Sequence, residues 1–328
     1  MKDILHQLFE HQTLDYSKAK NILTDIAKGI YNQSQVTAFL SAYQMRSITV
    51  QELSGFRDAL LDLSLPIDLS EFDPIDLCGT GGDRKNTFNI STLASFVVAG
   101  AGIKVSKHGN YGVSSSCGSS NVMEHFGYQF TNEESILRKQ IEEAGICFLH
   151  APLFHPAMKF VAPIRRELGI KTFFNMLGPM VNPSQPKKQI VGVYSLELAR
   201  LYNYLYQQTD HAYYIIHSLD GYDEISLTGK FKLISADKEQ ILSPDDLHLN
   251  TILPHEIYGG DTIEESAKIF MDVLNNNTTQ AHKNVVVANA GFAIHCAKPE
   301  LSLADSFQMA RESIESGNAL SCFKTLIK

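Results

Sequence analysis

The residues with the clearest chemical potential form a glycine-rich segment, Gly79-Thr80-Gly81-Gly82-Asp83, which follows the apolar run Pro74-Ile75-Asp76-Leu77-Cys78. The pattern predicts a strand, a turn and then a helix capped by Ser91 or Thr92. Glycine allows a positive φ and a close approach to a ligand, and amide groups at the start of a helix attract anions, most often phosphate. A phosphate would repel Asp83, so we expect this carboxylate to bind sugar hydroxyls or a cation.

Glycines alone do not decide between a phosphate site and an ordinary tight turn. The segment is neither a dinucleotide fingerprint nor a Walker loop, because the glycine spacing differs and no Gly-Lys-Ser or Gly-Lys-Thr follows. A second segment repeats the pattern: the strand-like run Ile103-Lys104-Val105-Ser106 leads into a polar loop that begins Lys107-His108-Gly109-Asn110 and continues with several serines. Two loops that follow neighbouring parallel strands share one crevice, where we expect a pyrophosphate and a phosphosugar to bind.

These loops resemble those of the anthranilate phosphoribosyltransferase family, tryptophan-pathway enzymes that join anthranilate to phosphoribosyl pyrophosphate. Residues 155–183 and 220–226 also match the family, and residues 259–261 and 289–291 do so more weakly. The resemblance therefore spans nearly the whole chain in the family's order. Four positions depart from the usual pattern and concern the surroundings of the site: Cys117, Asn121, Lys171 and Met180.

The resemblance implies particular binding residues. Phosphoribosyl pyrophosphate is expected to contact both loops, at Gly79, Gly82, Asp83, Thr87, Asn89, Ile90, Ser91, Thr92, Lys107, His108, Gly109, Asn110, Ser114, Ser115 and Ser119. Anthranilate is expected to contact Gly79, His108, Asn110, His155 and Arg165. The guanidinium of Arg165 would pair with the anthranilate carboxylate.

A metal site is implied by the resemblance more than by the residues themselves. On their own, Asp223 and Glu224 fit a solvated turn better than a metal site. Carboxylates and diphosphates share Mg²⁺ as a cation, and the family's acidic pair falls at these two residues, with Ser91 matching a hydroxyl at another magnesium. The expected cofactor is therefore Mg²⁺, and the expected reaction is displacement of pyrophosphate by the amine of anthranilate. No residue is assigned as a general base, because the protein mainly orients two substrates.

Composition limits the class of protein. The chain has 328 residues and a formal net charge of −8, which argues against a general nucleic-acid or membrane surface because such partners favour basic patches. No apolar run is long enough to span a bilayer. Five cysteines without a CxxC pair indicate free thiols in a reducing compartment, so we expect a cytoplasmic protein. Packing explains Cys78 and Cys117 better than a role as nucleophile.

The pattern predicts a small all-helical domain and a larger α/β domain with a central, mostly parallel sheet flanked by helices. Residues 1–66 show apolar stripes at helical spacing and a capping box, Thr49-Val50-Gln51-Glu52. Residues 67–164 and 182–328 alternate short β-branched runs with helices and form the larger domain. By the resemblance, residues 165–181 return to the small domain, the active site is a cleft between the domains, and the protein is a homodimer.

Two other functions are compatible with parts of this pattern. A pyrimidine nucleoside phosphorylase resembles the family in fold, but its phosphate loop differs from Lys107-His108-Gly109-Asn110. A non-catalytic relative that binds nucleic acid is the more distant alternative, and the acidic charge argues against it. An assay with phosphoribosyl pyrophosphate against nucleoside plus phosphate, and a gel-shift assay, separate the three functions.

Overall fold

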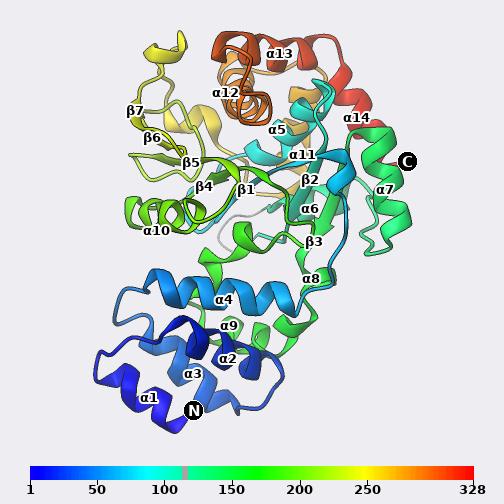
Figure 1. Cartoon of the computed structure of the whole chain (residues 1–328). Helices are drawn as coiled ribbons and strands as arrows, with labels where there is room; N and C mark the ends of the chain where they lie inside the picture. The colour runs from blue at the N-terminus through cyan, green and yellow to red at the C-terminus, as the bar shows by residue number, and fades with distance from the viewer. Residues whose placement is uncertain (113–116) are drawn as a thin grey trace. The chain divides into compact units, whose positions relative to one another are not determined.

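The computed structural model describes residues 1–112 and 117–328, and the chain divides into two compact units (Figure 1). Met1–Pro66 and Ala151–Pro183 form a helical unit, and Ile67–His150 with Ser184–Lys328 form an α/β unit. The returning segment is longer than the predicted 165–181, because residues from Ala151 onward already pack with the helical unit. Two predicted site residues, Ser114 and Ser115, lie outside the described residues.

The α/β unit contains a seven-stranded sheet in the order β3-β2-β1-β4-β5-β6-β7. Its strands are β1 (Ile75–Gly79), β2 (Val105–Gly109), β3 (Ile146–His150), β4 (Lys188–Gly192), β5 (Ala212–Ser218), β6 (Phe231–Ile234) and β7 (Glu239–Leu242). The first five are parallel, and β6 and β7 pair antiparallel to their neighbours. The predicted fold class is confirmed. The hairpin of β6 and β7 was not predicted, since each strand has only four residues.

Helices cover both faces of this sheet (Figure 1). They are α5 (Ile90–Gly100), α6 (Ser119–His125), α7 (Glu134–Ala144), α10 (Leu196–Tyr206), α11 (Ile263–Leu274), α12 (Gln280–Ala297), α13 (Leu303–Glu315) and α14 (Asn318–Leu326), with short 3-10 helices η1 (Ser70–Phe72), η5 (Asp245–Leu247) and η6 (Pro254–Ile257). Successive side chains on a strand face opposite sides. Leu77 and Ile190 therefore face the core with α5 and α12. Asp76 and Gln189 lie on the other face, where Gln189 accepts a hydrogen bond from Tyr206 of α10.

The strand order identifies where a ligand is expected. β1 lies between β2 and β4, so the connections from β1 and β4 leave on opposite sides of the sheet. This is a topological switch point, and ligands of open parallel sheets bind beyond the carboxyl ends of the strands at such a point. Among the described residues, no helix has the length and apolar character needed to cross a membrane. All five cysteine thiols are free.

The helical unit is built around aromatic rings. It contains α1 (Lys2–Phe9), α2 (Tyr16–Ala27), α3 (Gln33–Ala42), α4 (Val50–Asp62), α8 (Ala151–Phe154), η2 (Pro156–Phe160), α9 (Ala162–Leu168), η3 (Phe173–Met176) and η4 (Gly178–Val181). Phe173 of the returning segment stacks on Phe56 at 4.4 Å between ring centroids and meets Phe39 edge-on at 6.0 Å. These contacts fix the returning segment to the N-terminal helices.

Glu52 holds several parts of the helical unit together. The predicted capping box at Thr49 and Glu52 is confirmed, but the fully buried Glu52 carboxylate also accepts hydrogen bonds from the Leu14 amide at 2.9 Å, the Tyr43 hydroxyl at 3.0 Å and the Arg46 guanidinium. Burial alone would raise the pKa of Glu52, but Arg46 and the backbone amides hold it below its usual value. Glu52 is therefore charged and fully bonded inside the unit.

Replacing Glu52 with alanine is expected to lower the free energy of unfolding by about 3–5 kcal/mol, because the Arg46 charge then lies beside unsatisfied buried groups. Urea unfolding followed by circular dichroism measures this loss. Asp62→Ala is the control, since Asp62 pairs with Lys20 on the surface and such pairs contribute little. An equal loss in both variants would contradict the role given to Glu52.

Candidate active site

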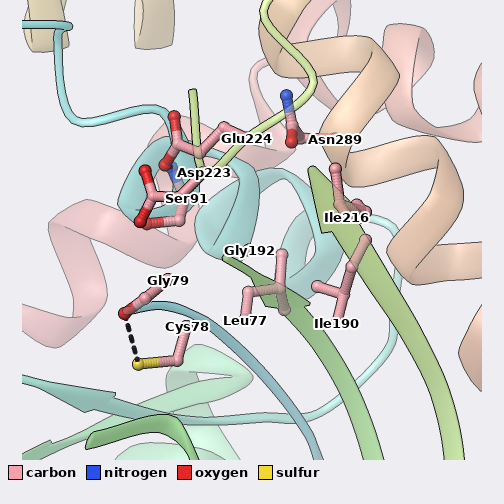
Figure 2. Close-up of a pocket in the computed structure, with 10 residues that line it drawn as sticks. All are labelled: Leu77, Cys78, Gly79, Ser91, Ile190, Gly192, Ile216, Asp223, Glu224 and Asn289. Carbon is pink, nitrogen blue, oxygen red and sulfur yellow. Dashed lines mark hydrogen bonds between the residues drawn. The ribbon is translucent and has the colours of Figure 1, made fainter. Parts of the chain in front are cut away.

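A small pocket opens at the switch point, where β1 and β4 end (Figure 2). It is lined by Leu77, Cys78, Gly79, Ser91, Ile190, Gly192, Ile216, Asp223, Glu224 and Asn289. These residues come from β1, β4, β5, α5, α12 and the segment after β5. The pocket therefore gathers the first predicted loop and the predicted acidic pair.

Two glycines let the acidic segment pass close over the strand ends. A Cβ atom at Gly79 would lie 2.5 Å from Asp223 Oδ2, and one at Gly192 would lie 1.4 Å from the Asp223 carbonyl oxygen. No side chain fits at either position unless the acidic pair moves. Gly79 was predicted as a site residue, whereas the role of Gly192 was missed because it depends on a contact with a distant part of the chain.

The acidic pair accepts hydrogen bonds from backbone amides of the first loop. Asp223 Oδ2 accepts from the Gly81 amide at 2.7 Å, and Glu224 Oε1 accepts from the Ser91 amide at 3.1 Å. Gly81 has a φ of +63°, so glycine is favoured there. The prediction that Ser91 or Thr92 caps the helix is wrong: α5 begins at Ile90, and the Glu224 carboxylate satisfies an amide of its first turn.

The charge of this pair calls for a cation. Burial raises the pKa of both carboxyl groups, and the neighbouring charge of Asp83 raises it further. Glu224 Oε2 is buried without a hydrogen-bond partner among the described residues. Mg²⁺ prefers oxygen ligands and keeps positions for phosphate oxygens and water, so Asp223, Glu224 and the Ser91 hydroxyl fit this ion. Within residues 1–112 and 117–328, no group of three or more His, Cys, Asp and Glu side chains is placed to hold a metal.

Asn289 fixes the backbone directly after the acidic pair. Its Oδ1 accepts from the Ile225 amide at 3.1 Å, and its Nδ2 donates to the carbonyl oxygens of Ile225 at 2.9 Å and Val285 at 2.8 Å. The Ser218 hydroxyl donates to the Glu224 carbonyl oxygen at 2.6 Å. The Asn289-Ala290-Gly291 similarity was the sequence signal for this residue, but its contact with Ile225 was not predicted.

The other predicted residues of the first loop lie between β1 and the first turn of α5: Gly82, Asp83, Thr87, Asn89, Ile90 and Thr92. Asp83 accepts a hydrogen bond from the Lys85 amide at 3.0 Å, and Thr87 forms an isolated antiparallel bridge with Tyr258. Their contacts with substrate stay predictions. The Cys78 thiol lines the pocket, and burial together with the Asp76 charge raises its pKa, so it is protonated at neutral pH and unsuited to act as a nucleophile.

The second loop begins later than predicted: β2 runs through Gly109, so Lys107 and His108 lie in the strand and the loop starts at Asn110. Lys107 is 2% exposed, and its Nζ donates to the carbonyl oxygen of Leu77 at 2.6 Å. His108 is also buried, and its amide donates to Asp76 Oδ1 at 3.2 Å. Lys107 was expected to meet phosphate. Leu77, which accepts from its ammonium group, lines the pocket, and a phosphate contact by Lys107 stays a prediction.

Side chains hold the described part of this second loop in place. Gly109 is the last residue of β2, and the Ser119 hydroxyl donates to the carbonyl oxygen of Asn110 at 3.2 Å. Asn121 Oδ1 accepts from the amides of Gly112 at 2.9 Å and Gly118 at 3.0 Å. Asn121 departs from the family's usual aspartate, yet its amide oxygen supplies the acceptor that these loop amides need.

Two predicted anthranilate residues belong to the helical unit. Arg165 on α9 is half-buried, its Nη2 donates to Asn175 Oδ1 at 3.3 Å, and its Cζ lies 5.3 Å from the Phe174 ring centroid. Burial lowers the pKa of Arg165. His155 is buried, with Nε2 at 2.9 Å from the Val181 carbonyl oxygen, and burial lowers its pKa to about 4. His155 is therefore neutral at pH 7, and its burial in the helical unit explains its presence without a ligand. A substrate contact by either residue stays a prediction.

The helical unit and the α/β unit correspond to the two domains of a glycosyl transferase family. Residues 2–64 match the model described as "Glycosyl transferase family, helical bundle domain", and residues 71–320 match "Glycosyl transferase family, a/b domain". The chain is 59% identical over 328 residues, all of both sequences, to the anthranilate phosphoribosyltransferase of Cytophaga hutchinsonii. The chain belongs to the anthranilate phosphoribosyltransferase family.

Solved structures agree with this assignment. Anthranilate phosphoribosyltransferase from Thermus thermophilus superposes with a TM-score of 0.91 at 29% identity, covering 98% of each chain. The Saccharomyces cerevisiae enzyme in complex with PRPP (phosphoribosyl pyrophosphate) and Mg has a TM-score of 0.91 at 28% identity, covering 98% of this chain and 95% of that one. The family resemblance read from the sequence is therefore confirmed.

Replacing Asn289 with aspartate is expected to lower the free energy of unfolding by about 1–3 kcal/mol, because the carbonyl groups of Ile225 and Val285 lose their donor. The added negative charge should also displace the acidic pair and weaken Mg²⁺ binding. Urea unfolding and calorimetric titration with Mg²⁺ measure the two effects. The exposed Asn276, which has a φ of +54°, supplies the control Asn276→Asp; the assignment fails if both variants behave alike.

Proposed function

We propose that this chain transfers the phosphoribosyl group of 5-phosphoribosyl 1-pyrophosphate to the amine of anthranilate. The products are pyrophosphate and N-(5-phosphoribosyl)anthranilate, in tryptophan biosynthesis. The observation that carries the proposal is the acidic pair Asp223 and Glu224, bonded to amides of the glycine loop at the switch point. The full-length identity of 59% to a relative of that name supports the same reaction.

The α/β unit would bind phosphoribosyl pyrophosphate through both loops. The backbone amides after β1 and at the start of α5 provide donors for phosphate oxygens. Mg²⁺, held by Asp223, Glu224 and the Ser91 hydroxyl, would neutralise charge on the departing diphosphate. Lys107 would exchange the Leu77 carbonyl oxygen for a phosphate oxygen, because an ammonium–phosphate hydrogen bond is the stronger of the two. Asp83 would orient the ribose hydroxyls.

The protein's part in the reaction is orientation and charge stabilisation. The amine of anthranilate attacks the ribosyl carbon as the bond to pyrophosphate breaks, and positive charge develops on the sugar in the transition state. Fixed amides and charges stabilise such a state without reorganising, and alignment of the two substrates lowers the barrier further. The amine releases its proton to pyrophosphate or water, so no general base is assigned.

Arg165 would bind the carboxylate of anthranilate. Its guanidinium has an amide oxygen and an aromatic ring as neighbours, and no salt bridge joins it to a described carboxylate. A planar guanidinium matches a carboxylate with two parallel hydrogen bonds. The adjacent Arg166 is exposed on the same helix, so its environment differs and it offers a comparison.

A fluorescence assay tests the reaction directly. Anthranilate fluorescence should fall when the protein is mixed with phosphoribosyl pyrophosphate and Mg²⁺. Phosphorolysis of a pyrimidine nucleoside in the presence of phosphate would instead indicate a nucleoside phosphorylase. Activity in the second assay and none in the first would overturn the proposal.

We also propose a cytoplasmic homodimer. Support for the dimer comes from large apolar side chains exposed on the helical unit, Phe9 at 59%, Ile30 at 61% and Met45 at 80%, since exposed apolar surface is a feature of protein interfaces. Support for the compartment comes from five cysteines that are all free. Sedimentation equilibrium tests the dimer, and a monomer at micromolar concentration would contradict it.

Arg165→Ala is expected to raise the KM for anthranilate strongly and to leave the affinity for phosphoribosyl pyrophosphate nearly unchanged. Loss of a desolvated charge pair corresponds to about 2–5 kcal/mol. Steady-state kinetics with each substrate varied in turn measure the effect, and Arg166→Ala is the matched control. Equal weakening of both substrates by Arg165→Ala would exclude the carboxylate assignment.

Asp223→Asn combined with Glu224→Gln is expected to reduce turnover by about 100-fold or more at ordinary Mg²⁺ concentrations, because charge stabilisation of the leaving group is lost. Excess Mg²⁺ should restore part of the rate, since the diphosphate brings its own ligands. Rates measured across a Mg²⁺ titration check this. Asp220→Asn, on the exposed side of the same loop, should behave as wild type; an unchanged Mg²⁺ dependence in the double variant would disprove the metal assignment.

A further inference from the structure

The pairing of β1 with β2 stops after one residue pair, next to the pocket. The register records Ile75 opposite Val105, whereas β1 and β4 are paired over five residues. The Ile75 amide donates to the Lys104 carbonyl oxygen at 3.0 Å, so the odd-numbered residues of β1 point their amides and carbonyls toward β2. In a regular parallel ladder, the His108 amide would then donate to the Leu77 carbonyl oxygen.

Side chains satisfy both halves of this missing bond. The His108 amide donates to Asp76 Oδ1 at 3.2 Å, and the Leu77 carbonyl oxygen accepts from Lys107 Nζ at 2.6 Å. Leu77 lines the pocket, as Figure 2 shows. One backbone hydrogen bond is therefore replaced by two side-chain hydrogen bonds, and the second of them brings an ammonium group to the pocket wall.

We infer that Asp76 is a positioning residue for the phosphate site: by accepting the His108 amide, it keeps the Leu77 carbonyl oxygen available to hold Lys107. The inference rests on the proposed function, because that function makes Lys107 a phosphate ligand. Without the Asp76 acceptor, the His108 amide would compete with Lys107 for the Leu77 carbonyl oxygen, and the ammonium group would be held less firmly.

The surroundings of Asp76 fix its carboxylate from two sides. The residue is fully buried, and its Oδ2 accepts from Gln189 Nε2 at 3.1 Å. Gln189 Oε1 in turn accepts from the Tyr206 hydroxyl of α10. A carboxylate is expensive to bury unless its oxygens are bonded, so this network keeps Asp76 Oδ1 directed at β2.

The neutral acceptor that holds Lys107 affects how this residue can bind phosphate. A carbonyl oxygen is a neutral acceptor, so the bond to Leu77 does not itself cancel the positive charge of Lys107, which also acts on the Glu224 carboxyl group. An incoming phosphate oxygen offers a charge-assisted bond in exchange, which is about twice as strong as a bond to a neutral group. Lys107 is thus placed to pass from Leu77 to a polyanion.

Asp76→Asn and Asp76→Ala separate the acceptor from the charge. Asparagine keeps an oxygen that accepts from the His108 amide. Its Nδ2 group can donate to Gln189 if the Gln189 side-chain amide flips, and Gln189 Nε2 then donates to the Tyr206 hydroxyl oxygen. Alanine removes the acceptor. Calorimetry with phosphoribosyl pyrophosphate at saturating Mg²⁺ should show binding within about threefold of wild type for Asp76→Asn and about tenfold weaker binding for Asp76→Ala. The KM for anthranilate should change little in either variant.

A double-mutant cycle with Lys107→Met checks that Asp76 acts through Lys107. Lys107→Met should weaken phosphoribosyl pyrophosphate binding in the wild-type background and have little further effect in Asp76→Ala. Thermal melts confirm that each variant is folded, and Asp76→Ser replaces Asp76→Ala where the latter does not fold.

The outcomes separate this inference from the proposed function. Wild-type protein that fails to bind phosphoribosyl pyrophosphate overturns the proposed function and this inference with it. Wild-type binding that Asp76→Ala retains overturns the inference alone, as does additivity in the cycle. Equal loss in folded Asp76→Asn and Asp76→Ala would show that the charge matters rather than the acceptor, and this also overturns the inference.

Discussion

The α/β unit depends on the close passage of the acidic segment over the ends of β1 and β4. Gly79 and Gly192 leave room for Asp223 where any Cβ atom would collide with it. Because the segment lies so near the strand ends, its carboxylates reach the amides of Gly81 and Ser91. The same contact therefore shapes the glycine loop, satisfies the start of α5 and places two acids at the switch point.

Burying two neighbouring acids is unfavourable unless something compensates their charge. Backbone amides supply part of the compensation here, and the amino end of α5 adds the favourable end of its dipole. Burial still raises the pKa of both acids, which indicates that their charge is not fully balanced by the protein. A cation and its phosphate ligands complete the balance, so the same groups that destabilise this part of the fold favour binding there.

The mostly parallel sheet, the two strands before the loops and the glycine loop could be predicted from local signatures of apolar runs and glycines. The acidic pair was predicted from the family resemblance, since its residues alone favour a solvated turn. The short strands β6 and β7 lack such a signature. Gly192, Asn289 and Asp76 have roles that depend on residues far along the chain, such as the Asn289 contact with Ile225 across 64 positions. The cap of α5 was predicted wrongly because Glu224, a distant residue, accepts the Ser91 amide.

Basic side chains that serve the fold and those proposed to bind substrate have different hydrogen-bond partners. Arg46 is bonded to the Glu52 carboxylate inside the helical unit, so its charge is cancelled and serves the fold. Lys107 and Arg165 instead donate to neutral oxygens, the Leu77 carbonyl and the Asn175 amide. A neutral acceptor orients a cation without cancelling it, and an anion can therefore replace that acceptor with a gain in electrostatic energy. Two buried or half-buried cations held in this way suit a protein whose proposed substrates are both anions, even though its net charge is −8.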